Sequence, residues 1–395
     1  MYILLYLSFL TFFSSIPYSL LTYTLQNWQL DAHMSIAQVS FLAVIQAPYF
    51  LNPVWGGLID RYRHLVDEQA YMLLGVSIVT LACYGFSIVD PSSIFFWLNG
   101  LTMCLGASWF DAALGSYRSH FSGRYLASVS ASIGVSYRVG MILFQAGLVV
   151  LASQYNWQII YRGLMYFSLL WIVSIIALHV QVKTKENVKV SFKILTDWLS
   201  LKIGWDGLIF FFFFNASYFW LSSIMLSYLR LNLHIDAVTV AETVKFYGMA
   251  ITLSMSFVAA WWIKRFRFKR MPVLLTIQVI GQLVMMLIMN SSQAPVTQMF
   301  ELVCLDSIMH GFLSTIIVAL ILDCAPSAFP ATGIALLTSI SLVARLIIGS
   351  LGGWVFENML SLFWLVFFVL SIIPLIVSKT SQFSVRVFNP GAKSF

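Results

Sequence analysis

Residues 359–378 read MLSLFWLVFFVLSIIPLIVS, a run of twenty residues without a single charged side chain. The hydrocarbon core of a bilayer is about 30 Å thick, and a helix needs about 20 apolar residues to cross it. This run therefore predicts a transmembrane helix.

The composition of the whole chain agrees with this stretch. Of 395 residues, 60% are hydrophobic and only 9% are charged, whereas about 25% charged residues is usual in soluble domains. So few charged side chains do not cover the surface of a water-soluble protein of this length. We therefore predict an all-α polytopic membrane protein.

Eleven similar apolar stretches precede this one, each ended by a charge, a proline or a polar cluster. With residues 359–378 the chain has twelve such stretches, and its longest polar stretch separates the first six from the last six. This predicts an N-terminal six-helix half over 1–182, a cytoplasmic linker over 183–204, a C-terminal half over 205–378 and a cytoplasmic tail over 379–395. The twelve predicted spans are 2–27, 36–60, 70–89, 93–117, 130–153, 158–182, 205–229, 238–263, 272–290, 296–322, 331–354 and 359–378.

Lysine and arginine residues are concentrated in the loops on one side of this arrangement. If the N-terminus is cytoplasmic, the inner loops and the tail hold most of the 22 basic residues, and the outer loops hold Arg230 alone. Basic loops face the cytoplasm, so we expect both termini there. The same rule explains the net charge of +7 without a nucleic-acid partner.

Two features recur, once in each half. Leu58–Arg63 reads LIDRYR and Trp262–Arg267 reads WIKRFR, while Arg138 and Arg345 each lie inside a span and are followed by glycines. The recurrence predicts a duplicated six-helix unit, the arrangement in which a substrate site lies between two halves that rock about it.

Ionisable side chains inside the spans are the first candidates for chemistry, because inserting each one costs at least about 2.5 kcal/mol. Asp306 and His310 share one helical face at i, i+4, Glu301 precedes them, and Arg345 lies near the middle of its span. We expect Arg345, Asp306, Glu301 and His310 to bind substrate or a coupling proton. The alternative is a structural ion pair between spans 296–322 and 331–354.

Polar residues also gather around the prolines of the first two spans. Pro17, Pro48 and Pro53 each remove a backbone donor, and helices broken in this way often line transport cavities. We expect the polar residues near these prolines, Gln26, Tyr49 and Asn52, to bind substrate. Simple helix kinks are the alternative interpretation.

Asp111 and Arg138 have similar predicted depths in the membrane and are expected to pair, either to gate the inner mouth or to fasten the bundle. Glu242 and Lys245, three residues apart near a helix end, are interpreted as a structural pair. Arg162 lies about one turn inside the outer end of span 158–182, so its side chain is expected to reach water.

Several sequence motifs are absent. The chain has no G-x-x-x-x-G-K-[ST], H-E-x-x-H or G-x-S-x-G motif and no cluster of metal ligands. Nucleotide-driven transport and the common hydrolytic enzymes are therefore not expected. We predict no enzyme activity, no cofactor and no metal site.

Gly56–Arg63 resembles the loop signature G-x-L-x-D-R-x-G-R of the major facilitator superfamily, with Arg63 where the signature has glycine. A narrower resemblance, to the AmpG-type muropeptide permease branch, extends along nearly the whole chain. Its residues here are Ser15–Tyr18, Thr24–Trp28, Ala47–Tyr49, Asp60–Tyr62, Asp111–Ala112, Ser136–Met141, Trp157, Tyr161, Phe300–Glu301, Gly311, Arg345, Gly349 and Gly353–Trp354.

The branch also includes short siderophore permeases and acetyl-CoA transporters, and the compact twelve-span plan is closer to the siderophore permeases. The resemblance implies that Asp60 and Arg61 hold the inward-closed contact between helices. Branch members often carry a second acid one turn before Asp111, where this chain has Ala107. This difference shifts the expected proton site from span 93–117 towards span 296–322.

Together these features predict a monomeric secondary transporter in the cell inner membrane, whose partners are a small-molecule substrate, protons and the lipid bilayer. We expect proton-coupled import of an amphipathic solute such as a siderophore or a muropeptide. Proton-coupled efflux of a drug or metabolite is the alternative, and a membrane receptor without transport activity is a third interpretation.

Overall fold

The computed structural model describes residues 2–62, 65–119, 135–177, 192–324, 330–381 and the positions 383, 387 and 388. Every regular element in these residues is a helix, mostly α with short 3-10 and π segments. The prediction of an all-α fold is confirmed.

Within the described residues, ten helical segments are long and apolar enough to cross a membrane. The two predicted spans without a counterpart among the ten are 93–117 and 238–263. The first falls on helix α6 (Ile94–Ser119), and the second on α13 (Ala237–Glu242), η6 (Thr243–Tyr247) and α14 (Gly248–Phe266). The count of twelve spans and the cytoplasmic position of both termini stay predictions.

The chain divides into two compact units that are not simple sequence halves. Residues 36–41 group with the second unit, and residues 327–339 group with the first. The predicted boundaries at 182 and 204 therefore stay a prediction. Residues 178–191, which hold part of the predicted linker, lie outside the described residues.

The first unit is built around buried aromatic side chains. Trp28 stacks on Tyr161 with ring centroids 5.3 Å apart and on Trp157 at 6.2 Å, and Phe86 contacts the same tyrosine at 5.0 Å. Besides α6, its helices are α1 (Tyr2–Ser19), η1 (Leu20–Thr24), α2 (Leu25–Asp31), η2 (Phe41–Leu51), α4 (Asn52–Tyr62), α5 (Glu68–Phe86), η3 (Ile142–Gly147), α8 (Leu148–Ala152), α9 (Trp157–Ala177) and the start of α17 (Pro330–Ala344).

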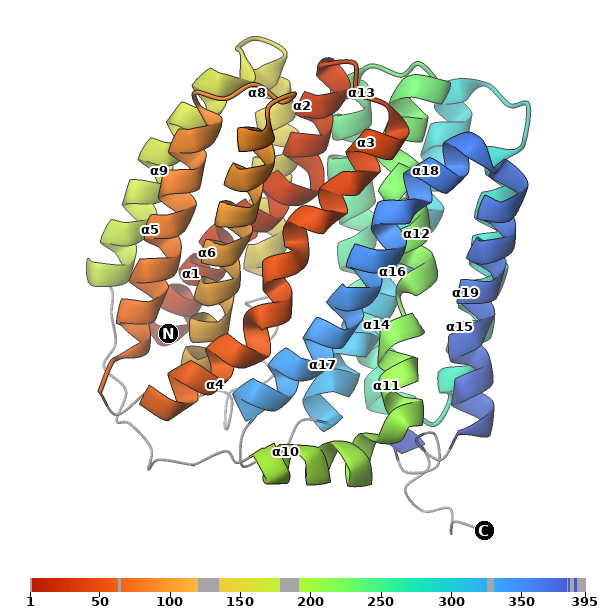
Figure 1. The fold of residues 1–395 in the computed structure, drawn as a ribbon. Coiled ribbons are helices and arrows are strands. Elements are labelled where there is room, and N and C mark those ends of the chain that lie inside the picture. The colour runs from red at the N-terminus through yellow and green to blue at the C-terminus, as the bar shows by residue number, and fades with distance from the viewer. Residues whose placement is uncertain are drawn as a thin grey trace. The chain divides into compact units, whose positions relative to one another are not determined.

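In the second unit, α10 (Phe192–Trp198) lies across the end of α11 (Gly204–Phe213) (Figure 1). Besides the end of α17 and the elements already given, its helices are α3 (Ile36–Ser40), η4 (Leu199–Ile203), α12 (Ala216–Ser227), η5 (Tyr228–Asn232), α15 (Met271–Met289), α16 (Pro295–Cys324), η7 (Arg345–Gly349), α18 (Ser350–Asn358) and α19 (Leu360–Thr380).

The prolines of the second predicted span change its helix type. Residues Phe41–Leu51 form a 3-10 helix that contains Pro48, and an α-helix resumes at Asn52. Pro53 has no N–H to donate to the carbonyl of Tyr49, four residues earlier. The Ser339 hydroxyl donates to that carbonyl instead, at 3.2 Å. The hydrogen bond satisfies a backbone group that the proline leaves unpaired.

Candidate functional site

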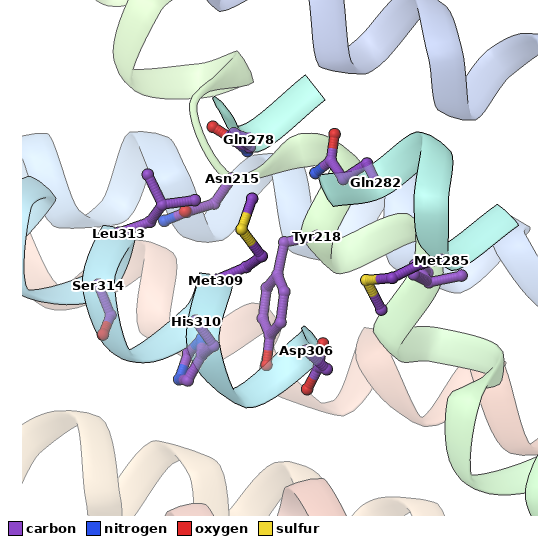
Figure 2. A pocket seen from close by; sticks show the side chains of 11 residues that line it. Asn215, Tyr218, Gln278, Gln282, Met285, Asp306, Met309, His310, Leu313 and Ser314 are labelled. Atoms are coloured by element: carbon purple, nitrogen blue, oxygen red, sulfur yellow. The ribbon is translucent and has the colours of Figure 1, made fainter. Parts of the chain in front are cut away.

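Asp306 and His310 line a small pocket inside the second unit (Figure 2). They lie one turn apart on α16, as the i, i+4 spacing predicts. The ring of Tyr218, from α12, stacks on the His310 imidazole with centroids 4.7 Å apart and planes 18° from parallel. Figure 2 shows the tyrosine reaching from the glutamine side of the pocket towards Asp306 and His310.

Two glutamines of α15 form the opposite wall. Gln278 is 2% exposed and Gln282 is 6% exposed. Their amide groups donate to the Phe214 carbonyl at 3.5 Å and to the Ser217 hydroxyl at 2.7 Å. The Oε1 atom of each is buried without a hydrogen-bond partner. A buried unpaired carbonyl oxygen is unfavourable, so each glutamine holds an acceptor whose hydrogen-bonding capacity is not used in this conformation.

The helix that faces these glutamines is interrupted at the pocket. α11 ends at Phe213 and α12 begins at Ala216, with Asn215 at φ −106° and ψ 6° between them. The break leaves carbonyls of the preceding turn open to side-chain donors, and the Ser341 hydroxyl donates to that of Phe211 at 2.9 Å. Discontinuous helices at membrane depth are typical of ion and substrate sites in transporters.

The pocket measures ≈ 20 Å³, which is room for about one water molecule. The described residues that line it include one carboxylate and one imidazole but no lysine or arginine. The pocket can therefore hold one water or one small cation beside a titratable pair. It contains no group of three metal-binding side chains among the described residues.

The other two candidates of the second half lie elsewhere. Glu301 precedes Asp306 on α16, is half-buried, and does not line the pocket. Arg345 is the first residue of the π-helical segment η7, and its guanidinium carbon lies 5.7 Å from the centre of the Phe219 ring. Segment η3, in the first unit, is also a π-helix and begins four residues after Arg138. Arg345 thus lies in a π segment and Arg138 lies close to one, a feature frequent at functional sites.

The polar candidates of the first half form a second cluster. The Tyr49 hydroxyl donates to Asp111 Oδ2 at 3.3 Å. The Ser108 hydroxyl lies 2.7 Å from Asn52 Oδ1 and 3.1 Å from the Pro48 carbonyl. The structure thus brings Tyr49, Asn52 and Asp111 to the contact of η2 and α4 with α6. Gln26 lies half-buried on α2.

Asp111 has a different cationic neighbour from the one expected. Among the described residues, the cation that acts electrostatically on Asp111 is Arg118, and not Arg138. Arg118 follows the predicted span 93–117, whereas the structure includes it in the last turn of α6. Seven residues separate it from Asp111, which puts both on one helical face. Arg118 also donates to the Thr11 hydroxyl at 2.7 Å.

Three of the remaining candidates, Arg61, Arg162 and Glu242, are exposed. Arg61 is exposed, with its guanidinium carbon 5.5 Å from the centre of the Tyr62 ring. Asp60 belongs to α4, but its side chain lies outside the described part of the structure, as does that of Lys245. Arg162 and Glu242 are both exposed.

Sequence reasoning missed Asn215, Tyr218, Gln278 and Gln282. The two glutamines carry a signal, because they lie four residues apart in the run Val273–Met289, whose only other polar residue is Thr276. Asn215 follows a run of five phenylalanines and precedes Ala216 and Ser217, a change of composition that is compatible with a helix break.

The chain is similar to known transporters along most of its length. It is 21% identical over 361 residues to the anhydromuropeptide permease of Escherichia coli K12, covering 88% of this chain and 73% of the permease. It is 20% identical to putative transporter AmpG 2 of Rickettsia bellii, covering 89% and 90% of the two chains.

Solved structures share the fold. A D-xylose-proton symporter matches with a TM-score of 0.71 at 9% identity, covering 96% of both chains. The D323A mutant of the nucleoside transporter NupG matches with a TM-score of 0.72 at 12% identity, covering 94% of this chain and 98% of the transporter. The Major Facilitator Superfamily model matches residues 7–349. The chain therefore belongs to the Major Facilitator Superfamily and is a multi-span membrane transporter.

Proposed function

We propose that this permease imports an amphipathic, oxygen-rich solute across the inner membrane, coupled to proton entry, and that the solute is a muropeptide. The Asp306–His310 pocket carries the proposal of coupling, because it holds two titratable groups inside an apolar helix bundle. The name of the E. coli relative, an anhydromuropeptide permease, favours a muropeptide over the siderophore also considered.

The proposed coupling step uses only groups that line the pocket. A proton entering from outside binds the Asp306 carboxylate. His310 and one water then accept this proton and release it towards the inside. Tyr218 holds the imidazole by stacking. Gln278 and Gln282 line the same pocket and keep its opposite wall polar. A group that titrates within the bundle biases the equilibrium between two conformations, which is the physical basis of coupling.

Binding of the solute is assigned to the other polar candidates. Arg345 pairs with a carboxylate of the solute, since guanidinium and carboxylate form two parallel hydrogen bonds. Gln26, Tyr49 and Asn52 bind its hydroxyl and amide groups, and Glu301 contributes a further acceptor. Asp111 and Arg138 tune the inner gate, and Asp60 with Arg61 holds the inward-closed state.

Uptake into proteoliposomes tests the substrate and the direction of transport. Liposomes that contain the full-length protein, with an acidic exterior, receive labelled anhydromuropeptide in one arm and a ferric siderophore in the other. We expect saturable accumulation of the muropeptide, abolished by a protonophore, and no accumulation of the siderophore. Accumulation of the siderophore alone would overturn the substrate assignment, and uptake that ignores the protonophore would overturn the coupling.

An arginine pair tests the binding site in the same assay. Arg345→Ala is expected to lose muropeptide uptake by at least about tenfold, because a charge-assisted pair contributes about 1.5–3 kcal/mol. Arg162→Ala, which removes an exposed arginine of α9, is the matched control and is expected to transport normally. Full uptake by Arg345→Ala would show that this residue does not bind the solute.

A further inference from the structure

A second and larger cavity lies in the second unit, and the proposed transport mechanism does not use it. It measures ≈ 590 Å³. Four separate segments line it, and they are Leu201–Lys202 of η4, residues 267–269 between α14 and α15, Asp323–Cys324 at the end of α16, and Val387–Phe388 near the C-terminus. None of these residues belongs to the Asp306–His310 pocket.

The lining of this cavity is basic. Lys202, Arg267 and Lys269 face one acidic residue, Asp323, which leaves an excess of positive charge. The three basic side chains are exposed and accessible to a ligand. Lys202 donates to the backbone carbonyl of Asp323 at 3.2 Å, so this cation is held at the cavity. Several basic groups around a hollow on one side of a membrane protein are the arrangement that binds phosphate head groups.

Phe388 forms an apolar part of the cavity wall. It is 1% exposed, and its ring lies 5.6 Å from that of Phe210 on α11 and 5.5 Å from that of Phe383. The backbone N–H of Phe383 donates to the Asp206 carboxylate. Phe383 and Phe388 are therefore both held against α11.

Arg267 occupies a strained backbone position at the rim. It follows the last residue of α14 with φ 48° and ψ −135°, where glycine is the usual residue. Strain of this kind is concentrated at functional sites. An arginine at a position where glycine is usual favours a ligand-binding role for its guanidinium.

The neighbouring surface favours contact with lipid. Leu201 is 75% exposed and Trp205 is 82% exposed, on either side of the bend between η4 and α11. The Trp198 indole donates to the Cys324 carbonyl at 3.3 Å and attaches α10 to the end of α16. Exposed tryptophan and leucine beside lysine are typical of a helix at the membrane interface.

We propose that this cavity binds the phosphate head group of an anionic phospholipid, with Lys202, Arg267 and Lys269 as the groups that bind the phosphate. Leu201 and Trp205 contact the acyl region. Free phosphate shares the head-group chemistry but offers nothing to these two apolar side chains, so the lipid is the assigned ligand.

Lipid binding to the purified full-length protein tests the proposal. Native mass spectrometry measures the affinity for dioleoylphosphatidylglycerol and for the zwitterionic dioleoylphosphatidylcholine. The test variant combines Lys202→Gln, Arg267→Gln and Lys269→Gln. Each lost cation is expected to weaken binding of the anionic lipid roughly fivefold, and the three together roughly 100-fold. The affinity for the zwitterionic lipid is expected to stay unchanged.

The matched control removes three basic residues of the same loop region that do not line the cavity, by Lys264→Gln, Arg265→Gln and Arg270→Gln. It is expected to keep the affinity within about twofold, since contact and not net charge decides binding. Equal losses in both variants would overturn the proposal. Displacement of the lipid by inorganic phosphate alone, or equal binding of the two lipids, would overturn the assignment to an anionic lipid. Unchanged thermal unfolding of both variants verifies that they fold.

Discussion

Single side chains decide what the small pocket of the second unit can hold. The Phe214 carbonyl only accepts hydrogen bonds, so it must face the amide nitrogen of Gln278. The Oε1 atom of that glutamine is therefore left as an acceptor without a partner. The pocket has room for about one water, and no lysine or arginine lies among the described residues that line it. The pocket is thus suited to a proton carrier and unsuited to the carboxylate of a solute.

An exposed loop gives a prediction at the same scale. Asp236 is the N-cap of α13, and its carboxylate accepts the Thr239 N–H at 2.8 Å. Hydrogen bonds from Thr239 hold the pKa of Asp236 below its usual value. Asp236→Ala is expected to lower the free energy of unfolding by about 1 kcal/mol at neutral pH, as measured by denaturation in detergent.

The loss of unfolding free energy caused by Asp236→Ala should disappear in acid. A carboxyl with a depressed native pKa stabilises the folded state above its unfolded pKa, and this stabilisation is lost as the pH falls through the native pKa. Asp67→Ala is the matched control, since Asp67 is the N-cap of α5 with similar backbone angles but no side-chain cap hydrogen bond. Equal effects of the two substitutions would contradict the capping role of Asp236.

At the scale of elements, close helix packing depends on particular glycines. A Cβ atom at Gly106 of α6 would lie 2.7 Å from the Gly75 carbonyl oxygen of α5 and 2.9 Å from Ile78 Cβ. Gly115, on the same helix, has nothing within 4 Å of such an atom. The two glycines share a helix and differ in what they face.

Gly106→Ala is expected to destabilise the protein by about 1–3 kcal/mol, because the backbone of α5 cannot move aside without repacking. Gly115→Ala is expected to be neutral or to stabilise by up to about 1 kcal/mol, since alanine is the better helix former. Thermal unfolding of both purified variants measures the difference. If the two variants unfold alike, this account of the α5–α6 contact is wrong.

Sequence periodicity predicts helices better than it predicts their interruptions. The apolar runs indicated the all-α fold and placed Asp306 and His310 on one face, because hydrophobicity and the helical repeat are local properties. The break at Asn215 and the pocket around it depend on partners in α15, α16 and α17. Such contacts join residues far apart in the chain, so the glutamine wall was not predicted.

The partner of Asp111 was missed for a related reason. Arg118 belongs to a helix that extends to Ser119, whereas the predicted span ended at residue 117. A charged residue at a span end is compatible with either a loop or a last helical turn, and helix boundaries are the least certain part of such predictions. Because the helix is two residues longer than predicted, it includes Arg118, and the cation near Asp111 is Arg118 and not Arg138.

At the scale of the whole molecule, family membership and fold agree with the sequence. The superfamily match covers residues 7–349, and the signature at Gly56–Arg63 had pointed to the same family. Members of one fold transport different solutes, so the role of each residue must be assigned from its own site. The distinction between proton binding and solute binding therefore needs a direct measurement.

Comparison of driven accumulation with exchange in Asp306→Asn provides that measurement. This substitution keeps the size of the side chain and removes its titration, so the variant should lose proton-driven muropeptide accumulation by at least about tenfold. It should keep exchange of labelled for unlabelled solute across the membrane, which needs binding but no net proton movement. Glu242→Gln, at an exposed carboxylate of α13, is the matched control and should behave as the wild type in both assays. Wild-type accumulation by Asp306→Asn would contradict the central claim that the Asp306–His310 pocket carries the coupling proton.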